Sequence, residues 1–498
     1  MTRLSRHHLK SLPRDVRRPS YDRAAVRAGV VHLGIGAFHR AHQAAIFEES
    51  LNAGDLRWGI IAASLRSPAV RDQMAPQDGL YTMLVRDGSA DRAQVIGAVR
   101  QVIVAPEDPE ALLAALTAPD THIVTLTVTE KGYKLDPATG GLVEGDAQVA
   151  ADLVSLKAPQ TAPGYLVAAL ARRKKEGLTP FTAISCDNLP HNGQRLRGAV
   201  LDLARRHDTA LADWIAAEGA FPETMVDRIV PATTADDVAA LGRRLGVEDQ
   251  AMVKTEPFSQ WVIQDWFCGP RPTFGAGVQV TAAVAPWEEA KLRLLNGAHS
   301  GIAYLGGLAG IDHVHEVLTL PEARTFVEAL WDEAEATLTP PPELDVAAYR
   351  RDLMARFDNP TLRHRTRQIA MDGSQKLPQR LLAPIAARLE EGQGVDALSL
   401  AVAAWIRWQA GVDDQGAGHV VDDPLARPIA EALSGASDSR GRVDAILALG
   451  AIVPPKLAEH AAWRETLMKW LSVLETHGAR AALAKLRSEK DAAPVVVS

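Results

Sequence analysis

Short apolar runs alternate with segments of helical periodicity through the first half of the chain. An apolar run of about four to eight residues fits a buried strand, whereas apolar residues recurring every three or four positions fit an amphipathic helix. Strands and helices that alternate along the chain predict a parallel sheet with helices on both faces. We expect strands at 30–35, 58–65, 99–104, 122–128 and 182–185, and helices at 40–52, 111–116 and 163–175.

The pattern changes after about residue 286, where strand signals fade and long amphipathic segments follow. The sequence therefore predicts an α/β protein with two domains, an α/β domain at 1–285 and a mostly α-helical domain at 286–498. Residues 1–29 are basic and poorly patterned, and we expect an arm that packs on a later domain. The tail after 487 is expected to be loose. Helices are expected at 287–308, 322–337, 345–357, 379–391, 397–409 and 460–476.

Composition excludes several classes of protein. The 498 residues include 54 Lys and Arg against 61 Asp and Glu, and no basic block is interleaved with aromatic residues, so nucleic acid is not an expected partner. The two cysteines, Cys186 and Cys268, lie far apart and indicate neither a zinc site nor a disulfide framework. No apolar run reaches about 18 residues, so we expect no membrane span and a cytoplasmic protein.

Residues 31–39 read VHLGIGAFH, an apolar strand that leads through G-x-G into a helix. Gly34 permits a tight turn, and Gly36 lets the backbone approach a pyrophosphate at the start of the helix. His39 stands where a third Gly or Ala is usual. The segment predicts a dinucleotide site, with a plain tight turn as the alternative. The predicted cofactor-binding residues are Gly34, Ile35, Gly36, Ala37 and Phe38.

The second expected strand ends in LRSP, without the carboxylate that binds the adenosine ribose in many NAD enzymes. Arg66 in this segment either meets a 2′-phosphate, lies along the adenine face, or is a solvated surface side chain. The choice between NAD and NADP therefore stays open at this point.

Residues 287–299, WEEAKLRLLNGAH, carry the polar groups best suited to chemistry. At about 100° per residue, Glu288, Lys291, Asn296 and His299 fall within an arc of roughly 140° that they share with two leucines. A solvated helix face is the alternative, but the leucines, the glycine at 297 and the apolar continuation predict a buried helix.

Buried polar groups need partners or a purpose. Burial favours the neutral amine of Lys291, which makes a usable general base, and the amide of Asn296 donates to an oxygen on which charge develops. His299 either holds the substrate hydroxyl or orients Lys291, and Glu288 relays the proton to solvent. The set suits interconversion of an alcohol and a carbonyl without a metal.

Two further segments have the same character. SCDNLPHNG at 185–193 follows an expected strand, so Asn188 is a candidate second amide donor unless these residues only form a turn. MVDRI at 225–229 places Asp227 in an apolar stretch, where it either binds a substrate hydroxyl or pairs with Arg228.

Nine segments together resemble the long-chain mannitol dehydrogenase family of polyol-specific dehydrogenases over roughly residues 30–415. The resemblance implies a Rossmann-type domain that binds a nicotinamide cofactor, a largely helical C-terminal domain that closes the cleft, and hydride transfer without metal. The segments are VHLGIGAFHRAHQA (31–44), WGIIAASLRSP (58–68), APQDGLYT (75–82), TVTEKGY (127–133), SCDNLPHNG (185–193), MVDRIVPATT (225–234), EPFSQWVIQDWF (256–267), KLRLLNGAHS (291–300) and QIAMDGSQKLPQR (368–380).

The resemblance also assigns roles to single residues. The pattern K-x-x-x-x-N-x-x-H maps the general base, an oxyanion donor and a substrate ligand onto Lys291, Asn296 and His299. Asn188 becomes the second oxyanion donor, and Glu288 becomes the proton relay. The remaining expected ligands are Asp227, Lys376 and Arg367 for the substrate and Arg66 and Glu130 for the cofactor.

The family divides between neutral polyols and sugar acids. We expect the mannitol branch, which interconverts D-mannitol and D-fructose, because HVHEV at 313–317 looks like that branch. Fructuronate reductase, acting between D-mannonate and D-fructuronate, is the alternative, since 363–380 offers several cations for a carboxylate. NAD is the expected cofactor, with NADP possible, and the chain is expected to be a monomer or weak homo-oligomer. Remote alternatives are a sugar sensor without turnover and a dehydrogenase of the 6-phosphogluconate type.

Overall fold

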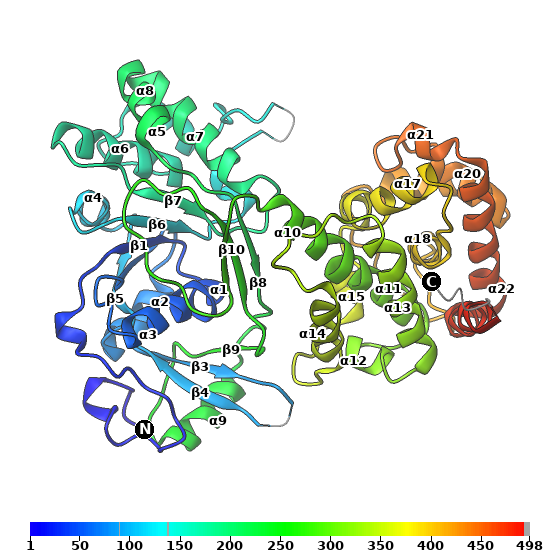
Figure 1. Cartoon of the computed structure of the whole chain (residues 1–498), viewed down its shortest axis with the longest axis horizontal. Coiled ribbons are helices and arrows are strands. Elements are labelled where there is room, and N and C mark those ends of the chain that lie inside the picture. The colour runs from blue at the N-terminus through cyan, green and yellow to red at the C-terminus, as the bar shows by residue number, and fades with distance from the viewer. Residues whose placement is uncertain (89, 137–138, 493–498) are drawn as a thin grey trace. The chain divides into compact units, whose positions relative to one another are not determined.

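The computed structural model describes residues 1–88, 90–136 and 139–492, and the chain divides into two compact units, Met1–Val284 and Ala285–Ser498. The first unit contains the strands, and the described elements of the second are helices joined by loops (Figure 1). The expected loose tail after 487 is wrong up to Ala492, where helix α22 ends, and residues 493–498 lie outside the described residues.

A five-stranded parallel sheet forms the centre of the first unit, in the order β5-β2-β1-β6-β7. The chain moves outward from β1 through β2 to β5 and then returns to the other side of β1 with β6, so the strand order reverses between β1 and β6. This crossing point is where ligands bind in open α/β sheets. The strands are β1 (Val30–Leu33), β2 (Ile60–Ser64), β5 (Val99–Val104), β6 (Ile123–Leu126) and β7 (Thr182–Ser185).

Helices cover both faces of this sheet, which confirms the predicted layers (Figure 1). Successive strand residues point to opposite faces, so Val30 packs in one apolar cluster with Phe47 while Val31 packs in the other with Leu166. The expected helix at 40–52 begins earlier and breaks at His42, whose φ and ψ of −119° and −87° are not helical. The helices around the sheet are α1 (Ala37–Ala41), α2 (Gln43–Asn52), α3 (Ala69–Met74), α4 (Pro109–Thr117), α5 (Ala147–Val154), α6 (Ala162–Lys175), α7 (Asn192–His207) and α8 (Thr209–Glu218).

Two three-stranded sheets escaped the sequence prediction. Each contains an antiparallel pair, β3 with β4 in one and β8 with β10 in the other, and their shortest strands have three and four residues. Every residue of β11 is half-buried, so no apolar run marks that strand. The strands are β3 (Tyr81–Val85), β4 (Arg92–Ile96) and β9 (Val253–Thr255) in one sheet, and β8 (Thr224–Asp227), β10 (Gln260–Gln264) and β11 (Val278–Thr281) in the other.

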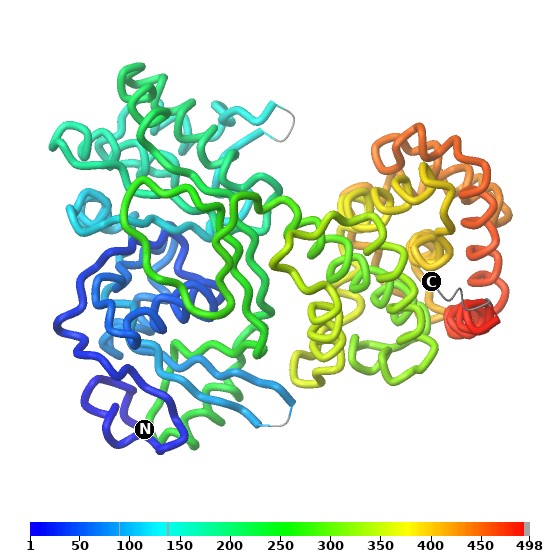
Figure 2. The backbone as a smooth tube through the Cα atoms, in the orientation of Figure 1, coloured from blue at the N-terminus to red at the C-terminus, as the bar shows by residue number. Residues whose placement is uncertain are grey.

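The N-terminal arm packs on the part of the first unit that follows it in the chain. Leu4, Leu12 and Val16 are buried against Leu80 and the apolar residues of β4 and α9 (Ala235–Leu245). Figure 2 shows this segment in dark blue beside β4. The arm therefore completes the core of the β3-β4-β9 sheet.

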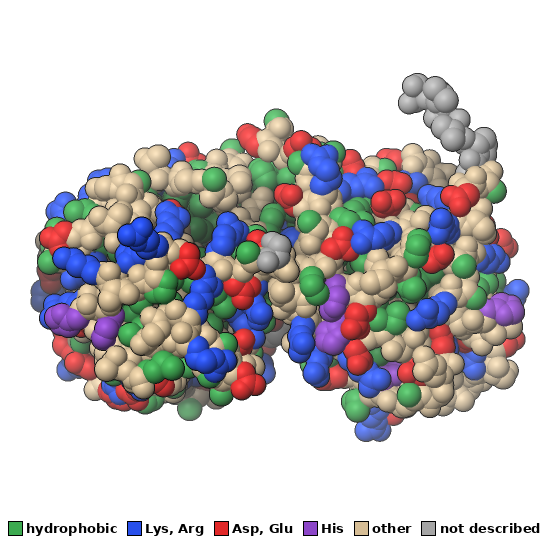
Figure 3. Space-filling model, turned by 90° about the horizontal axis from the view of Figure 1, so that it is seen from below, with side chains coloured by type: hydrophobic (Ala, Val, Ile, Leu, Met, Phe, Trp, Pro, Cys, Tyr) green, Lys and Arg blue, Asp and Glu red, His purple; other side chains and the backbone are tan. Residues whose placement is uncertain are grey.

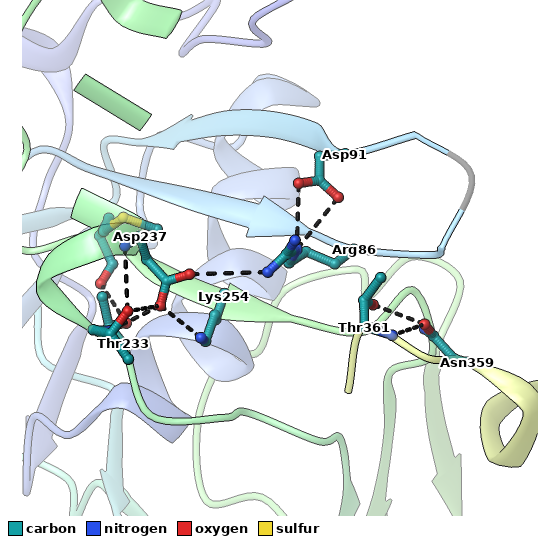
Figure 4. Close-up of polar contacts among 9 residues, drawn as sticks. Arg86, Asp91, Thr233, Asp237, Lys254, Asn359 and Thr361 are labelled. Carbon is teal, nitrogen blue, oxygen red and sulfur yellow. Dashed lines mark hydrogen bonds and ion pairs between the residues drawn. The ribbon is translucent and has the colours of Figure 1, made fainter. Parts of the chain in front are cut away.

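An ion-pair group fastens α9 to that sheet (Figure 4). The carboxylate of Asp237 lies 2.6 Å from the ammonium of Lys254 on β9 and 3.9 Å from the guanidinium of Arg86, which follows β3. Asp237 also accepts a hydrogen bond from the backbone N–H of Thr234, whose side chain in turn caps the first turn of α9. The start of α9 is thus fixed on the sheet edge.

The second unit is built around α18 (Asp396–Trp408), of which every residue except Asp396 and Arg407 is buried. The long helix α22 (Ala461–Ala492) packs along it and bends at Gly478, which has a φ of 80°. Each of the six helices expected in this half corresponds to an observed helical segment, and five of the expected ranges extend beyond the observed helix by one or two residues. The others are α10 (Ala285–Ala290), η5 (Lys291–Asn296), α11 (Gly297–Leu308), α12 (Val314–Val317), α13 (Pro321–Glu335), α14 (Val346–Asp358), α15 (Thr366–Ile369), α16 (Gly373–Leu377), η6 (Pro378–Leu382), α17 (Ala383–Glu390), α19 (Ala426–Leu433), α20 (Ser439–Leu447) and α21 (Pro455–Ala458).

Acidic and basic side chains are interspersed over the face shown in Figure 3. This mixture agrees with the small net charge of −7. Among the described residues, no helix is both long enough and apolar enough to span a membrane.

The buried carboxylate of Glu333 caps the N-terminus of α18. Glu333 on α13 is 4% exposed and accepts hydrogen bonds from the backbone N–H groups of Ala397 and Leu398, both at 2.9 Å. Burial raises the pKa of Glu333 to about 7, although the two backbone donors and the charges of Lys490 and Arg388 oppose the rise.

Glu333 should make the stability of the second unit depend on pH. Because its pKa in the folded chain lies above the ordinary value of 4.5, the folded chain binds the proton more tightly. The stability from this group is complete below about pH 4.5 and is lost as the pH rises through about 7, by up to about 3 kcal/mol. In thermal unfolding, the Tm of the wild type minus that of Glu333→Gln should fall between pH 5 and pH 7.5. Glu328→Gln, on the exposed side of α13, is the control, and a pH-independent difference for Glu333→Gln contradicts the assignment.

Candidate active site

A cavity of about 310 Å³ lies in the first unit at the carboxyl ends of β1, β2 and β6, where the strand order reverses. Four of the predicted cofactor ligands line it: Gly34, Ile35, Gly36 and Arg66. The remaining wall comes from the segments that follow β2 and β6 and from the start of α6. Those lining residues are Ser64, Leu65, Ser67, Val70, Thr127, Val128, Thr129, Gly132, Lys134, Gln148, Gln160, Thr161 and Ala162.

The two glycines after β1 have different roles. Gly34 has a φ of 98°, and a Cβ on it would lie 2.2 Å from the carbonyl oxygen of Thr127, so no other residue fits there. Gly36 is exposed at the start of α1, and a Cβ there would meet only the Gly34 carbonyl oxygen at 3.9 Å. Gly34 therefore lets the turn after β1 lie close to the segment after β6, and Gly36 adds no side chain at the edge of the cavity.

His39, which replaces the usual third glycine, fills the space between α1 and β1. Its ring stacks on that of His32 with 3.3 Å between centroids and 10° between planes. Burial lowers the pKa of His32 to about 3 and holds the pKa of His39 well below its usual range, to which the neighbouring His32 contributes. Two neutral imidazoles thus make the helix–strand contact that glycine makes in the common motif.

The other predicted cofactor residues lie beside the cavity and do not line it. Ala37 and Phe38 are half-buried in the first turn of α1. Glu130 is exposed at the start of η4 (Glu130–Tyr133), with its carboxylate 4.0 Å from the guanidinium of Arg195. None of the described lining residues is Asp or Glu, and Arg66 is exposed at the rim. The wall that usually binds the adenosine ribose through a carboxylate is therefore neutral or basic here.

Asn188 and Asp227 lie at the carboxyl ends of two strands of the first unit, β7 and β8. Asn188 is exposed three residues after β7, and Asp227 is the last residue of β8, 6% exposed and paired in register with Gln260 of β10. Arg228 donates to the carbonyl oxygens of Ala41 at 2.6 Å and Glu256 at 3.1 Å. Arg228 thereby ties the end of β8 to the end of α1.

The segment from α10 to α11 carries Glu288, Lys291, Asn296 and His299 on one continuous helix, and its predicted burial is confirmed. Lys291 and His299 are 6% and 8% exposed, while Glu288 and Asn296 are half-buried. The expected spacing of 100° per residue is wrong, because η5 is a π-helical turn from Lys291 to Asn296. Hydrogen bonds in such a turn join residues five apart, so the side chains at its two ends, Lys291 and Asn296, project from the same face.

The glycine at the end of the π-turn has a packing reason. A Cβ on Gly297 would lie 3.1 Å from the carbonyl oxygen of Arg380, so glycine lets the second π-turn, η6, approach the first. The guanidinium of Arg380 donates to the hydroxyl of Ser300 at 3.2 Å, and that hydroxyl donates to the carbonyl of Asn296 at 3.0 Å. Arg380 is therefore linked to the helix that carries Asn296.

His299 lies in a buried and cationic environment. Its ring centroid is 4.6 Å from that of Phe357 and 5.5 Å from that of His364. Burial holds the pKa of His299 well below its usual range, and the charges of His364, Arg356 and Arg380 act in the same direction. The imidazole is neutral near pH 7 and can both accept and donate a hydrogen bond.

The two predicted cationic substrate ligands, Lys376 and Arg367, differ in burial. Lys376 on α16 is half-buried, donates to the carbonyl oxygen of Met371, and lies 3.6 Å from the carboxylate of Asp372. Burial lowers the pKa of Lys376, with Arg380 adding to the effect. Arg367 on α15 is exposed instead. Two other cations, the buried Arg356 and the half-buried Arg380, act on His299 by lowering its pKa.

Family comparisons match almost the whole chain. The family model described as the mannitol dehydrogenase Rossmann domain matches residues 28–275, and that described as the mannitol dehydrogenase C-terminal domain matches residues 283–472. Both correspond to the resemblance inferred from the sequence motifs.

Individual relatives agree with these models. A mannitol 2-dehydrogenase of Pyrenophora tritici-repentis is 43% identical over 86% of this chain and 77% of its own, and a D-mannonate oxidoreductase of Escherichia coli is 41% identical over 95% and 98%. The solved structure of Pseudomonas fluorescens mannitol 2-dehydrogenase, in a ternary complex with NAD and D-mannitol, is 34% identical with a TM-score of 0.82, covering 98% of this chain and 100% of that one. The chain belongs to the mannitol dehydrogenase family.

Proposed function

We propose that this protein is an NAD-dependent dehydrogenase that interconverts a secondary alcohol of an open-chain polyol or sugar acid with the corresponding ketone. The observation that carries the proposal is the π-turn that begins at Lys291 and ends at Asn296, which puts a buried amine and an amide donor on one face of a helix. An amine that takes a proton and an amide that donates to the same oxygen are the groups this chemistry needs.

The first unit fits a nicotinamide dinucleotide. The cavity at the strand reversal has the glycine turn of a dinucleotide site, and Gly36 leaves its edge free of side-chain atoms. Gly34, Ile35 and Gly36 would hold the pyrophosphate, and Arg66 would lie near the adenosine end. When bound, the cofactor supplies a hydride acceptor or donor. NAD is the cofactor in the solved relative, and the basic rim leaves room for NADP.

The proposed roles are a general base, a proton relay, two amide donors and the ligands of the substrate hydroxyls. Lys291 removes the hydroxyl proton of the alcohol, and Glu288 passes that proton to solvent. Asn296 and Asn188 donate to the oxygen as negative charge develops on it. His299, neutral because of its burial, holds a substrate hydroxyl, and Asp227 binds another hydroxyl. Lys376 and Arg367 complete the proposed substrate ligands, and Arg367 is the less supported of the two because it is exposed.

D-Mannitol and D-fructose are the proposed substrate pair. Mannitol 2-dehydrogenases are among the relatives with the highest identity. The match to the solved mannitol 2-dehydrogenase with D-mannitol covers 100% of that relative's chain. The segment HVHEV at 313–317, which favoured this branch, forms α12 and its N-cap, with His313 and Glu316 making a reciprocal cap.

A second candidate, reduction of fructuronate to mannonate, is favoured by the charges around His299. Burial lowers the pKa of Arg380 to about 10, so keeping this guanidinium charged is costly in the free protein. A substrate carboxylate would offset that cost. The D-mannonate oxidoreductase of Escherichia coli has similar identity to this chain over nearly all of its length.

Lys291→Ala tests the proposed chemistry. We expect kcat to fall by about 10²- to 10⁴-fold, the usual contribution of a general base, while NADH affinity stays within about twofold of the wild type. Stopped-flow absorbance of the nicotinamide and fluorescence titration with NADH measure the two quantities. Glu289→Gln, an exposed neighbour on the same helix, is the control. A Lys291→Ala variant with full kcat, or wild-type activity that EDTA abolishes and zinc restores, would refute the mechanism.

Arg380→Gln distinguishes the two substrate classes. Wild type and variant are assayed for NADH oxidation with fructose and with fructuronate, after circular dichroism establishes that the variant folds. If the substrate is a neutral ketose, the wild type turns over fructose and the variant changes its KM by less than about threefold. If Arg380 binds a substrate carboxylate, the wild type turns over only fructuronate efficiently. The KM of Arg380→Gln for fructuronate is then about tenfold or more above that of the wild type, on the scale of one lost charged hydrogen bond.

A further inference from the structure

One buried carboxylate of the first unit connects two loops that the sequence motifs had marked separately. Asp187, two residues after β7, is 9% exposed. Its oxygens accept hydrogen bonds from the backbone N–H groups of Val128 at 3.1 Å and Thr129 at 2.9 Å and from the hydroxyl of Tyr133 at 2.7 Å. Val128 and Thr129 form part of the wall of the proposed cofactor cavity.

The backbone of that wall is strained. Thr129 has a φ of 66° and a ψ of 166°, a region that is essentially restricted to glycine and is least favourable for a β-branched residue. Such a conformation persists only where the surroundings hold it. The backbone N–H of Thr129 is held by Asp187.

The main chain of Asp187 is fixed on its other side. The side-chain amide of Asn192 donates to the Asp187 carbonyl oxygen at 3.0 Å and to the carbonyl and hydroxyl oxygens of Thr224 at 2.9 and 3.0 Å. Thr224 begins β8, the strand that ends at Asp227. The residue next to Asp187 is Asn188, the proposed second oxyanion donor.

We propose that Asp187 is a positioning residue that holds the strained Val128–Thr129 wall of the cofactor cavity in register with Asn188 and β8. The inference rests on the proposed dinucleotide-dependent function. Asp187 is not among the residues that line the cavity, and in this role it acts through the two backbone N–H groups that it binds.

The role requires a carboxylate. All three groups that Asp187 binds are donors, and an ionised carboxylate offers acceptors only, whereas the isosteric amide of asparagine must turn its NH₂ group toward at least one of them. In either orientation a backbone N–H of the cavity wall then faces another donor. Burial raises the pKa of Asp187, and its three donors oppose that rise.

Asp187→Asn should therefore weaken cofactor binding. By fluorescence titration we expect the Kd for NADH to rise about 5- to 100-fold, the range for one buried donor left unsatisfied. The kcat at saturating cofactor should fall as well, because Asn188 is displaced. An unchanged Kd in a folded Asp187→Asn protein overturns the inference.

Thr129→Gly separates positioning from a general structural role. Glycine adopts the observed φ and ψ without strain, so the wall no longer needs to be held as tightly. In the Thr129→Gly background, Asp187→Asn should raise the Kd for NADH by less than half the factor seen in the wild type. Equal factors in the two backgrounds would show that Asp187 does not act through the strained residue and would overturn the inference.

Asp249→Asn is a matched control within the same unit. Asp249 is 1% exposed and also accepts from two backbone N–H groups, of Thr82 and Ala251, and from one side chain, that of Gln77. None of these donors lines the cavity. Asp249→Asn should lower the Tm as Asp187→Asn does and leave the Kd for NADH unchanged, and an equal rise in Kd for both variants would overturn the inference.

Two further outcomes are distinguishable. A wild-type protein that binds neither NADH nor NADPH refutes the proposed function, independently of Asp187. If Asp187→Asn does not fold, Tyr133→Phe replaces it, because it removes the hydroxyl that anchors the Asp187 oxygen bound by the Val128 N–H and so loosens that backbone contact. The expected rise in Kd for Tyr133→Phe is about two- to fivefold, and no rise at all in this folded variant overturns the inference.

Discussion

The close contact between Gly34 and the carbonyl of Thr127 is the constraint on which the first unit depends. At this point β1 and β6 run side by side, and a Cβ on Gly34 would lie only 2.2 Å from the carbonyl oxygen of Thr127. The turn leaves a cavity at the carboxyl ends of the strands, and the segment after β6 forms part of its wall. The glycine turn at the edge of this cavity therefore depends on that backbone approach.

Much of the parallel sheet could be predicted from the sequence because β1, β6 and β7 are buried along their whole length and most strand positions are apolar. The residues of β7 were placed at their observed bounds, 182–185. The two smaller sheets could not be predicted in this way, since β11 is half-buried throughout and β9 has three residues. Short strands at sheet edges carry too few apolar positions to show a period.

The candidate site divides along similar lines. Residue types and spacing were sufficient to mark Lys291, Asn296 and His299, but not the geometry between them. Helical periodicity assumes a hydrogen bond to the fourth residue, and nothing in KLRLLN signals a bond to the fifth. Asp187 was passed over for a different reason. Its partners belong to a loop more than fifty residues earlier in the chain, and such a connection exists only once β6 and β7 pair.

The stacked pair of His32 and His39 has a consequence for how dinucleotide-binding sequences are recognised. In the common fingerprint the third glycine keeps the helix close to the strand because it has no side chain, whereas here two flat rings occupy a slot between the same elements. What the fold requires at this place is a matched volume between positions 32 and 39, and glycine is only one way to provide it. A pattern that demands three glycines passes over this domain, while a pattern that pairs the two positions would find it.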